Sequence, residues 1–268
     1  IYGFVAGVSV KDLFLAGTVP GILFGLLFMI VCYRVGKSSG CDAGGQKTHW
    51  PTLGRSFLAT APALFMPVLI LGGIFSGFVT PTEAAALAVV YGLFVTMFVY
   101  RDFRLRDLPS LMVDAFVTSA IVMAVIGATS VLGWLITLEQ MPSILVGAVQ
   151  ELSSSPWVFL LLVNVVMLVL GLVLDPVPAI LLTAPLFLPT AQSFGVDPVH
   201  LGVVMTCNVA IGLFTPPVGA TLYVASRISG VGVLSIARSM ASLYGAAILA
   251  LALVTYIPAI SMTLVRMF

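Results

Sequence analysis

Residues 208–219, NVAIGLFTPPVG, break the helical pattern inside a stretch that is otherwise apolar enough to lie in lipid. Pro216 and Pro217 remove two backbone donors and block helical hydrogen bonding, while Gly212 and Gly219 permit unusual dihedral angles. Within hydrocarbon, the freed carbonyls are tolerated only where protein buries them or a polar ligand binds them. A helix broken at membrane depth is therefore a candidate ion or substrate site.

The composition predicts an all-α polytopic membrane protein. Of the 268 residues, 60% are hydrophobic and 8% are charged, whereas a soluble domain carries about 25% charged residues. The apolar runs are continuous rather than alternating, which argues against a transmembrane barrel and for helices surrounded by a lipid bilayer. A net charge of +1, without a basic run that interleaves aromatic residues, gives no support to a nucleic-acid partner.

Residue types that carry enzymatic or metal chemistry are scattered. Cys32, Cys41 and Cys207 form no CxxC pair, which excludes a disulfide framework or a zinc site of that kind. His49 and His200 have no neighbour at ligand spacing, and we interpret both as loop residues. No nucleophile elbow, HExxH pair or phosphate-cradling loop is present. The sequence thus predicts neither an enzyme nor a cofactor, and the chain itself is not expected to hydrolyse ATP.

Several segments approach the length of about 20 apolar residues that a membrane-spanning helix needs. The segments that we predict to span are 13–33, 56–78, 84–100, 111–136 with an interruption at 127–133, and 244–262. A short helix is predicted for 142–152. The remaining apolar segments are short or broken: 157–174, 179–193 and 201–226.

Segment 179–193 is too short to span and contains Pro185 and Pro189. We interpret it as one arm of a re-entrant hairpin whose tip is residues 174–178. Two full spans joined by an external loop are the alternative.

The loops at 34–55 and 101–106 hold seven of the eleven basic residues, so the positive-inside rule predicts that both are cytoplasmic.

Three carboxylates have a local sequence that suggests a role. A carboxylate at the bilayer centre costs about 2.5–3.5 kcal/mol. Asp175 is therefore a sodium ligand, a group that organises the hairpin tip, or a helix cap at a water-facing loop. Asp197, in a Gly-Val-Asp-Pro turn, and Glu83, which follows Thr80, have the residue types of helix starts, and we interpret both as structural.

Asn208, Gly212, Thr215 and Gly219 form the strongest set of candidate ligands. Unwound carbonyls and a hydroxyl supply the oxygen ligands that sodium prefers, without a net charge. The half-helix after Pro217 would point its positive N-terminal end at the break, where an anionic substrate group would bind. The alternative is a proline kink that serves only packing.

Hydroxyl groups in the segment 127–130, GATS, form a weaker candidate. Ser130 or its neighbour Thr129 would complete an ion shell from inside an apolar stretch. Small residues at helix–helix contacts explain the same pattern, and this packing interpretation is slightly favoured.

At these motifs the chain resembles the large membrane (DctM-type) subunit of tripartite ATP-independent periplasmic (TRAP) transporters. Three stretches carry the resemblance: 72–85, GGIFSGFVTPTEAA; 195–202, GVDPVHLG; and 208–219. The opening Ile1-Tyr2-Gly3, the segment KDLF at 11–14 and the pair Pro20-Gly21 also fit the middle region of that family. The similarity runs in order along the whole chain.

The resemblance implies sodium-coupled symport uptake of an organic acid anion, such as a C4-dicarboxylate, across the bacterial inner membrane. It implies an elevator mechanism with two inverted repeats, each with a hairpin and a broken helix. The implied partners are a small four-helix membrane subunit and a periplasmic substrate-binding protein. The implied division is scaffold and connecting helices in 1–110, a transport-domain repeat in 111–240 and a last membrane span in 241–268.

Matching motif positions assigns roles within the break and the hairpin. The implied sodium ligands are Ser130, Gly171, Asp175, Asn208, Gly212, Thr215 and Gly219. The implied substrate contacts are Thr215, Pro216 and Pro217. The family's first hairpin and first broken helix would precede Ile1, so we expect a C-terminal fragment with one repeat's share of the site.

Two other functions stay open at this point. One is a sodium-coupled carboxylate transporter that works without a binding protein. The other is a structural membrane subunit without transport activity, which would leave the proline-glycine break unexplained. A membrane-embedded enzyme is disfavoured because the spans contain no acid–base or nucleophile set.

Overall fold

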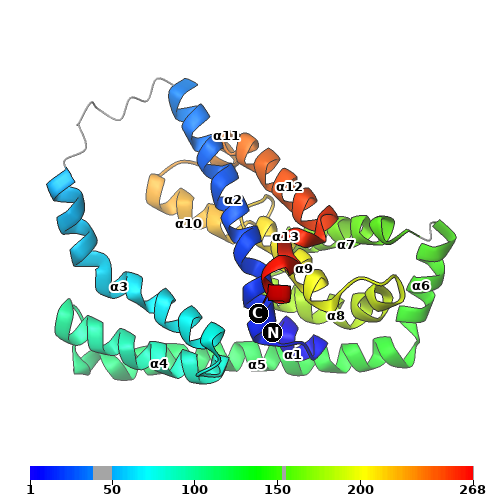
Figure 1. Cartoon of the computed structure of the whole chain (residues 1–268), viewed down its shortest axis with the longest axis horizontal. Helices are drawn as coiled ribbons and strands as arrows, with labels where there is room; N and C mark the ends of the chain where they lie inside the picture. Colours follow the sequence, from blue (N-terminus) through cyan, green and yellow to red (C-terminus); the bar gives the residue numbers. More distant parts are fainter. Residues whose placement is uncertain (39–49, 153–154, 268) are drawn as a thin grey trace. The chain divides into compact units, whose positions relative to one another are not determined.

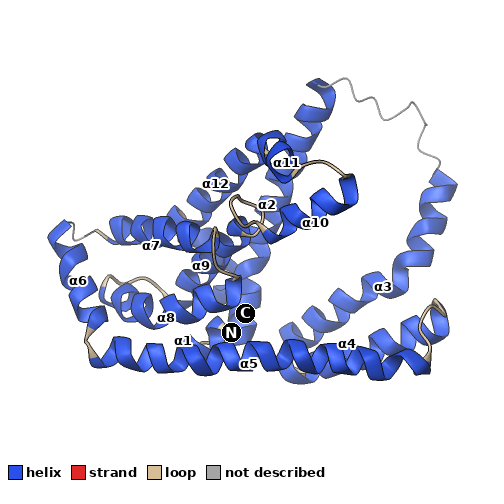
Figure 2. Ribbon diagram, turned by 180° about the vertical axis from the view of Figure 1, so that it is seen from behind, coloured by secondary structure: helices blue, strands red, loops and turns tan. Residues whose placement is uncertain are grey.

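The computed structural model describes residues 1–38, 50–152 and 155–267, so the predictions for Cys41 and His49 lie outside the described residues. Those described residues are helical and contain no strand (Figure 1, Figure 2). The helices are α1 Tyr2–Ala6, α2 Val10–Ser38, α3 Trp50–Ser76, α4 Pro81–Phe94, the π-helix η1 Val95–Val99, the 3-10 helix η2 Leu105–Asp107, α5 Leu108–Leu138, α6 Met141–Leu152, α7 Pro156–Gly171, α8 Pro176–Ser193, α9 Pro198–Gly212, α10 Ala220–Ser229, α11 Val233–Ser239, α12 Ala241–Tyr256 and α13 Pro258–Met267.

The predicted all-α polytopic class is confirmed. Among the described residues, four helical segments are long and apolar enough to cross a membrane, and the number rises to seven if each bent helix pair forms one span. The four are Val10–Ser38, Trp50–Ser76, Pro81–Val99 and Leu105–Leu138. The predicted last span at 244–262 is instead bent by 58° between α12 and α13, where Pro258 supplies no backbone donor.

The predicted interruption at 127–133 is wrong, because α5 runs unbroken from Leu108 to Leu138. Glycine costs a helix only about 1 kcal/mol relative to alanine and does not by itself end it. The hydroxyls of Thr129 and Ser130 donate to carbonyls one turn back, Val125 and Ile126. Their polar groups are thus satisfied within the helix.

Local cap signals fix two helix starts as the sequence predicted. Thr80 and Glu83 form a reciprocal capping box at the start of α4, with Thr80 N donating to Glu83 Oε2 over 2.7 Å. The Oδ1 of Asp197 accepts from the backbone of Val199 over 2.8 Å at the start of α9. Both carboxylates pair with otherwise orphaned N–H groups, which confirms their structural interpretation.

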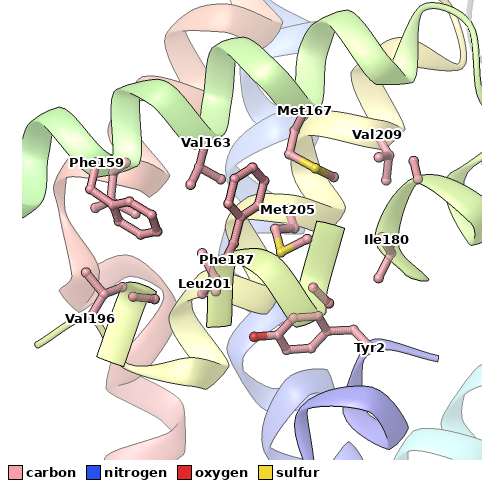
Figure 3. Packing of buried hydrophobic residues seen from close by; sticks show 14 of the residues in the cluster. Tyr2, Phe159, Val163, Met167, Ile180, Phe187, Val196, Leu201, Met205 and Val209 are labelled. Atoms are coloured by element: carbon pink, nitrogen blue, oxygen red, sulfur yellow. The ribbon is translucent and has the colours of Figure 1, made fainter. Parts of the chain in front are cut away.

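The chain divides into two compact units, residues 1–35 with 122–268 and residues 36–121. In the first unit, α7, α8 and α9 enclose the largest apolar core. Figure 3 shows Phe159, Val163 and Met167 of α7 directed toward Phe187 of α8 and Met205 of α9. The ring of Phe159 meets that of Phe187 edge-on at 6.3 Å between centroids.

Helix α9 is buried on every side along most of its length. A second side of α9 packs against α2, α12 and α13, where Val203 of α9 lies beside Ala16 of α2 and Val254 of α12. Its last turn, at Ile211, meets Ala247 and Leu251 of α12. A helix that is apolar all round belongs in a core, and α9 is accordingly the centre of this unit.

In the second unit, α3 and α4 pack against each other. The hydroxyl of Tyr91 donates to the carbonyl of Pro62 over 2.7 Å, and that of Tyr100 donates to the carbonyl of Ala59 over 3.0 Å. Ile74 is the buried residue of α3, and most large apolar side chains of this unit are exposed, as those of helices in contact with lipid would be.

Candidate functional site

Helices α7 and α8 form a hairpin, as the sequence analysis favoured. Helix α7 ends at Gly171, α8 begins at Pro176, and the two helices pack against each other. Asp175 caps α8 through its backbone carbonyl, which accepts from Ala179 N over 3.1 Å. Its carboxylate makes no capping hydrogen bond and is exposed at the tip, where it is free to meet a ligand or water.

The predicted break lies between α9 and α10, from residue 213 to residue 219. The hydroxyl of Thr215 donates to the carbonyl of Ile211 over 2.7 Å. Thr221 donates to the carbonyl of Leu213 from both its backbone N–H, at 3.2 Å, and its hydroxyl, at 2.8 Å. Gly219 begins α10 with φ 37°, a conformation that L residues with a side chain adopt at a cost.

The hairpin and the broken helix touch backbone to backbone at two glycines. A Cβ atom added to Gly212 would collide with the carbonyl group of Gly171 and lie 2.7 Å from its Cα. A Cβ atom on Gly171 would lie 3.4 Å from the Cα of Gly212 and 3.7 Å from the carbonyl oxygen of Asn208. Two predicted ligands far apart in sequence are thus in direct contact.

A hydrogen bond also joins the tip to the break, since Val218 N donates to the carbonyl of Leu172 over 3.3 Å. Within the described part of the chain, neither the carbonyl of Gly171 nor that of Thr215 accepts a hydrogen bond. The Gly171 oxygen lies against Gly212, and the Thr215 oxygen would lie 3.0 Å from a Cβ on Gly219. Unpaired carbonyl oxygens are good ligands for a hard cation.

Asn208 supplies a third free oxygen, about one turn before α9 ends at Gly212. Its side chain is fully buried, and its Nδ2 donates to the Oδ1 of Asn164 over 2.7 Å and to the carbonyl of Val204 over 2.8 Å. Its Oδ1 has no hydrogen-bond partner among the described residues. Leaving a buried acceptor unpaired costs about 1–3 kcal/mol, which a bound cation would offset.

A buried polar network continues from Asn164, which the sequence analysis did not single out. Its Nδ2 donates to the Oγ1 of Thr255 in α12 over 3.1 Å. His200 meets the Thr255 carbonyl at 3.3 Å through Nε2 and the hydroxyl of Ser261 at 2.7 Å through Nδ1. The interpretation of His200 as a loop residue is therefore wrong: it lies in the first turn of α9, buried, and pairs with the bend between α12 and α13.

The other predicted site residues lie on α5 and within the break itself. Ser130 is exposed on α5, and its hydroxyl donates to its own helix at Ile126 over 2.8 Å. Pro216 is half-buried and Pro217 is exposed, and the peptide bond between them is cis. Among the described residues, no three His, Cys, Asp or Glu side chains gather in a metal-binding group. The site thus offers neutral oxygens from Gly171, Asn208 and Thr215.

This combination of a helical hairpin, a proline-broken helix and a glycine contact between them agrees with a comparison to known proteins. Residues 1–260 match the family described as "Tripartite ATP-independent periplasmic transporter, DctM component". The chain belongs to this family. Together with its spanning helices, family membership makes it a multi-pass protein of the bacterial inner membrane.

Three relatives illustrate the range of the family. The chain is 41% identical over 268 residues to the "C4-dicarboxylate TRAP transporter large permease protein DctM" of Pseudomonas aeruginosa, covering 98% of this chain and 62% of that protein. It is 35% identical to the "Sialic acid TRAP transporter large permease protein SiaM" of Vibrio cholerae, covering 100% of this chain and 62% of that protein. It is 36% identical to the "Isethionate TRAP transporter permease protein DctMQ" of Oleidesulfovibrio alaskensis, covering 98% of this chain and 41% of that protein. The chain thus spans about six-tenths of the first relative's length.

Proposed function

We propose that this chain forms part of a sodium-coupled symporter for an organic acid anion, as the large membrane subunit of a TRAP transporter. The observation that carries the proposal is the state of Asn208, which lies beside the contact between the hairpin and the broken helix. Its side chain is fully buried, and its Oδ1 has no hydrogen-bond partner among the described residues. The free carbonyl of Gly171 supplies a further oxygen at the same contact, and that of Thr215 supplies one in the break, beside Gly219. A cation without a preference for charged ligands fits this donor set better than a divalent metal does.

The coupling would come from the two segments that meet at the site. Sodium bound by Gly171 of the hairpin and Asn208 of the broken helix would hold the tip and the break together. The ordered break would then present the N-terminal end of α10 to the anion, beside Pro216, Pro217 and Thr215. Sodium shifts the protein toward the anion-binding state only by as much as it binds that state more tightly.

Partners and substrate class follow from family membership. The names of the relatives include C4-dicarboxylate and sialic acid, which are carboxylates, and isethionate, which is a sulfonate. We propose an organic acid anion as the substrate, with a small four-helix membrane subunit and a periplasmic substrate-binding protein as partners. The re-entrant depth of the hairpin, the elevator movement and the ligand roles of Asp175, Gly212, Gly219 and Ser130 belong to the same proposal.

The test is the replacement Thr215→Val in the full-length transporter, reconstituted with its partners in proteoliposomes. Valine keeps the volume but removes the hydroxyl and perturbs the break whose carbonyl is free. We expect the half-saturating sodium concentration for uptake to rise about tenfold, which corresponds to about 1.4 kcal/mol of lost sodium binding.

Thr206→Val is the matched control, because Thr206 lies on α9, just before the break, and its hydroxyl makes the same kind of bond, to the carbonyl of Gly202 over 2.7 Å. We expect this variant to keep the sodium requirement of the wild type. An unchanged sodium requirement in Thr215→Val would show that the Thr215 hydroxyl neither binds sodium nor shapes the site. If uptake by the wild type does not depend on sodium, sodium coupling is rejected altogether.

A further inference from the structure

The neighbour that orients Asn208 is itself a buried amide on the hairpin. Asn164 of α7 is 6% exposed, and its Oδ1 accepts one of the two Nδ2 hydrogens of Asn208 over 2.7 Å. The backbone carbonyl of Val204 accepts the other over 2.8 Å. Both donors of the Asn208 amide are therefore occupied, and its Oδ1 is the atom left over.

The amide of Asn208 is not free to turn over. A flip would place its Oδ1 against the carbonyl oxygen of Val204, and two acceptors would then face each other without a proton between them. The direction of Asn164 is set in turn, since its Nδ2 donates to the Oγ1 of Thr255 over 3.1 Å. Thr255 is fully buried in α12, so the hydrogen-bonded series Thr255, Asn164 and Asn208 is anchored on that helix.

Helix geometry connects this pair to the glycine contact. Asn164 and Gly171 are seven residues apart on α7, and Asn208 and Gly212 are four residues apart on α9, so each pair shares one helix face. The face of α7 that carries Asn164 is the face that meets Gly212 through Gly171. The amide pair thus lies on the same α7–α9 seam as the free oxygens.

We propose that Asn164 is a positioning residue, which holds the carboxamide of Asn208 so that its Oδ1 is the atom presented to the cation. The inference rests on the proposed sodium site. Asn164 does not bind the ion itself. It fixes the orientation of the Asn208 side chain, whose Oδ1 binds the ion. Such pre-orientation by a hydrogen-bonded neighbour is how the partners of metal ligands raise affinity.

The test uses the purified full-length permease and measures the midpoint of thermal unfolding in sodium chloride against choline chloride at constant ionic strength. A ligand that binds the folded state stabilises it by RT ln(1 + [L]/Kd), so the midpoint rises with sodium concentration whatever the transported substrate is. For Asn164→Leu, which keeps the volume and removes the hydrogen bonds of the amide, we expect the sodium concentration that gives the same shift as in the wild type to rise about tenfold.

Two variants separate orientation from packing. Asn164→Asp keeps an acceptor toward Asn208 and an acceptor for the hydroxyl of Thr255, and we expect it to retain sodium binding within about threefold of the wild type. Thr190→Val removes a fully buried hydroxyl that is bonded within α8, to Leu186, and is expected to leave the sodium requirement unchanged. A merely structural Asn164 would lower every midpoint equally and leave the sodium shift intact.

The results divide cleanly. If Asn208→Leu abolishes the sodium shift and Asn164→Leu keeps the wild-type sodium requirement, the positioning role is overturned while the sodium site stands. A wild type that shows no sodium shift overturns the site itself. If Asn164→Leu does not fold, Thr255→Val decides, because it removes the support of Asn164 from α12; a sodium requirement equal to the wild type would then refute the inference.

Discussion

The two units of the chain handle polar groups in opposite ways. In residues 36–121, polar contacts lie at helix ends and between adjacent helices, as in the Thr80–Glu83 box and the bond from Tyr91 to Pro62. In the unit that contains α7–α9, amides, a histidine and hydroxyls are enclosed in the core, with Asn208 and Thr255 fully buried. The unit of residues 36–121 uses its polar groups to hold helices together, whereas the unit that contains α7–α9 retains one buried acceptor, the Oδ1 of Asn208, without a partner among the described residues.

That difference is the reason why we propose the ion site in the unit that contains α7–α9. Buried polar groups are normally satisfied, so the exception marks a position that the fold has kept for something else. The bare backbone contact between Gly171 and Gly212 supports the same conclusion, because it gives up side-chain packing to bring main-chain oxygens close. The α3–α4 pair shows neither feature, and we expect its variants to change stability without changing sodium dependence.

Gly212→Ala should give the largest effect and would sharpen the contrast most. The added methyl group collides with the carbonyl group of Gly171 and forces α7 and α9 apart. We expect a loss of about 1–3 kcal/mol in the free energy of unfolding, together with the loss of the sodium-induced shift in the unfolding midpoint. Gly245→Ala is the control: it lies in α12, where a Cβ meets nothing within 4 Å, and should not destabilise the protein.

Thr80→Ala probes the other unit with an intermediate effect. It removes the hydroxyl that accepts from Glu83 N over 3.3 Å in the capping box. We expect a loss of about 1 kcal/mol, measured as faster hydrogen exchange of the first-turn amides of α4. The sodium dependence of uptake should stay as in the wild type. A shifted sodium requirement would break the distinction between the two units.

Tyr91→Phe should give the smallest effect. It deletes the hydroxyl that bonds the carbonyl of Pro62 but keeps the ring, which packs edge-on against Phe65 at 5.7 Å between centroids. We expect a loss of about 0.5–1.5 kcal/mol, the net contribution of one hydrogen bond. Thermal unfolding of the purified protein measures it, and a change larger than that of Gly212→Ala would contradict our ranking.

Features that depend on neighbours in sequence were predictable. Glu83 and Asp197 were recognised as helix caps because a cap and its partners lie within three residues. The hairpin and the break were recognised because prolines and glycines act on their own backbone. The same local reasoning failed at residues 127–133, where glycines and hydroxyls sit inside a continuous helix.

Features that depend on partners distant in the sequence were not predictable. His200 looked like a loop residue because Thr255 and Ser261, which satisfy its ring, lie 55 and 61 positions away. Asn164 went unnoticed, although it is the one amide in the apolar run of α7, and a lone polar side chain at such a place is a warning of function. The roles of Thr215, Pro216 and Pro217 toward an ion or an anion stay predictions.

The enclosure of α9 bears on how the protein is made. With 15 residues, this helix is about 22 Å long at 1.5 Å per residue, short of the roughly 30 Å hydrocarbon layer. Its surroundings include α12 and α13, which the ribosome delivers after it. The helix that carries the unpaired Asn208 Oδ1 therefore cannot complete its packing until α12 and α13 have been synthesised.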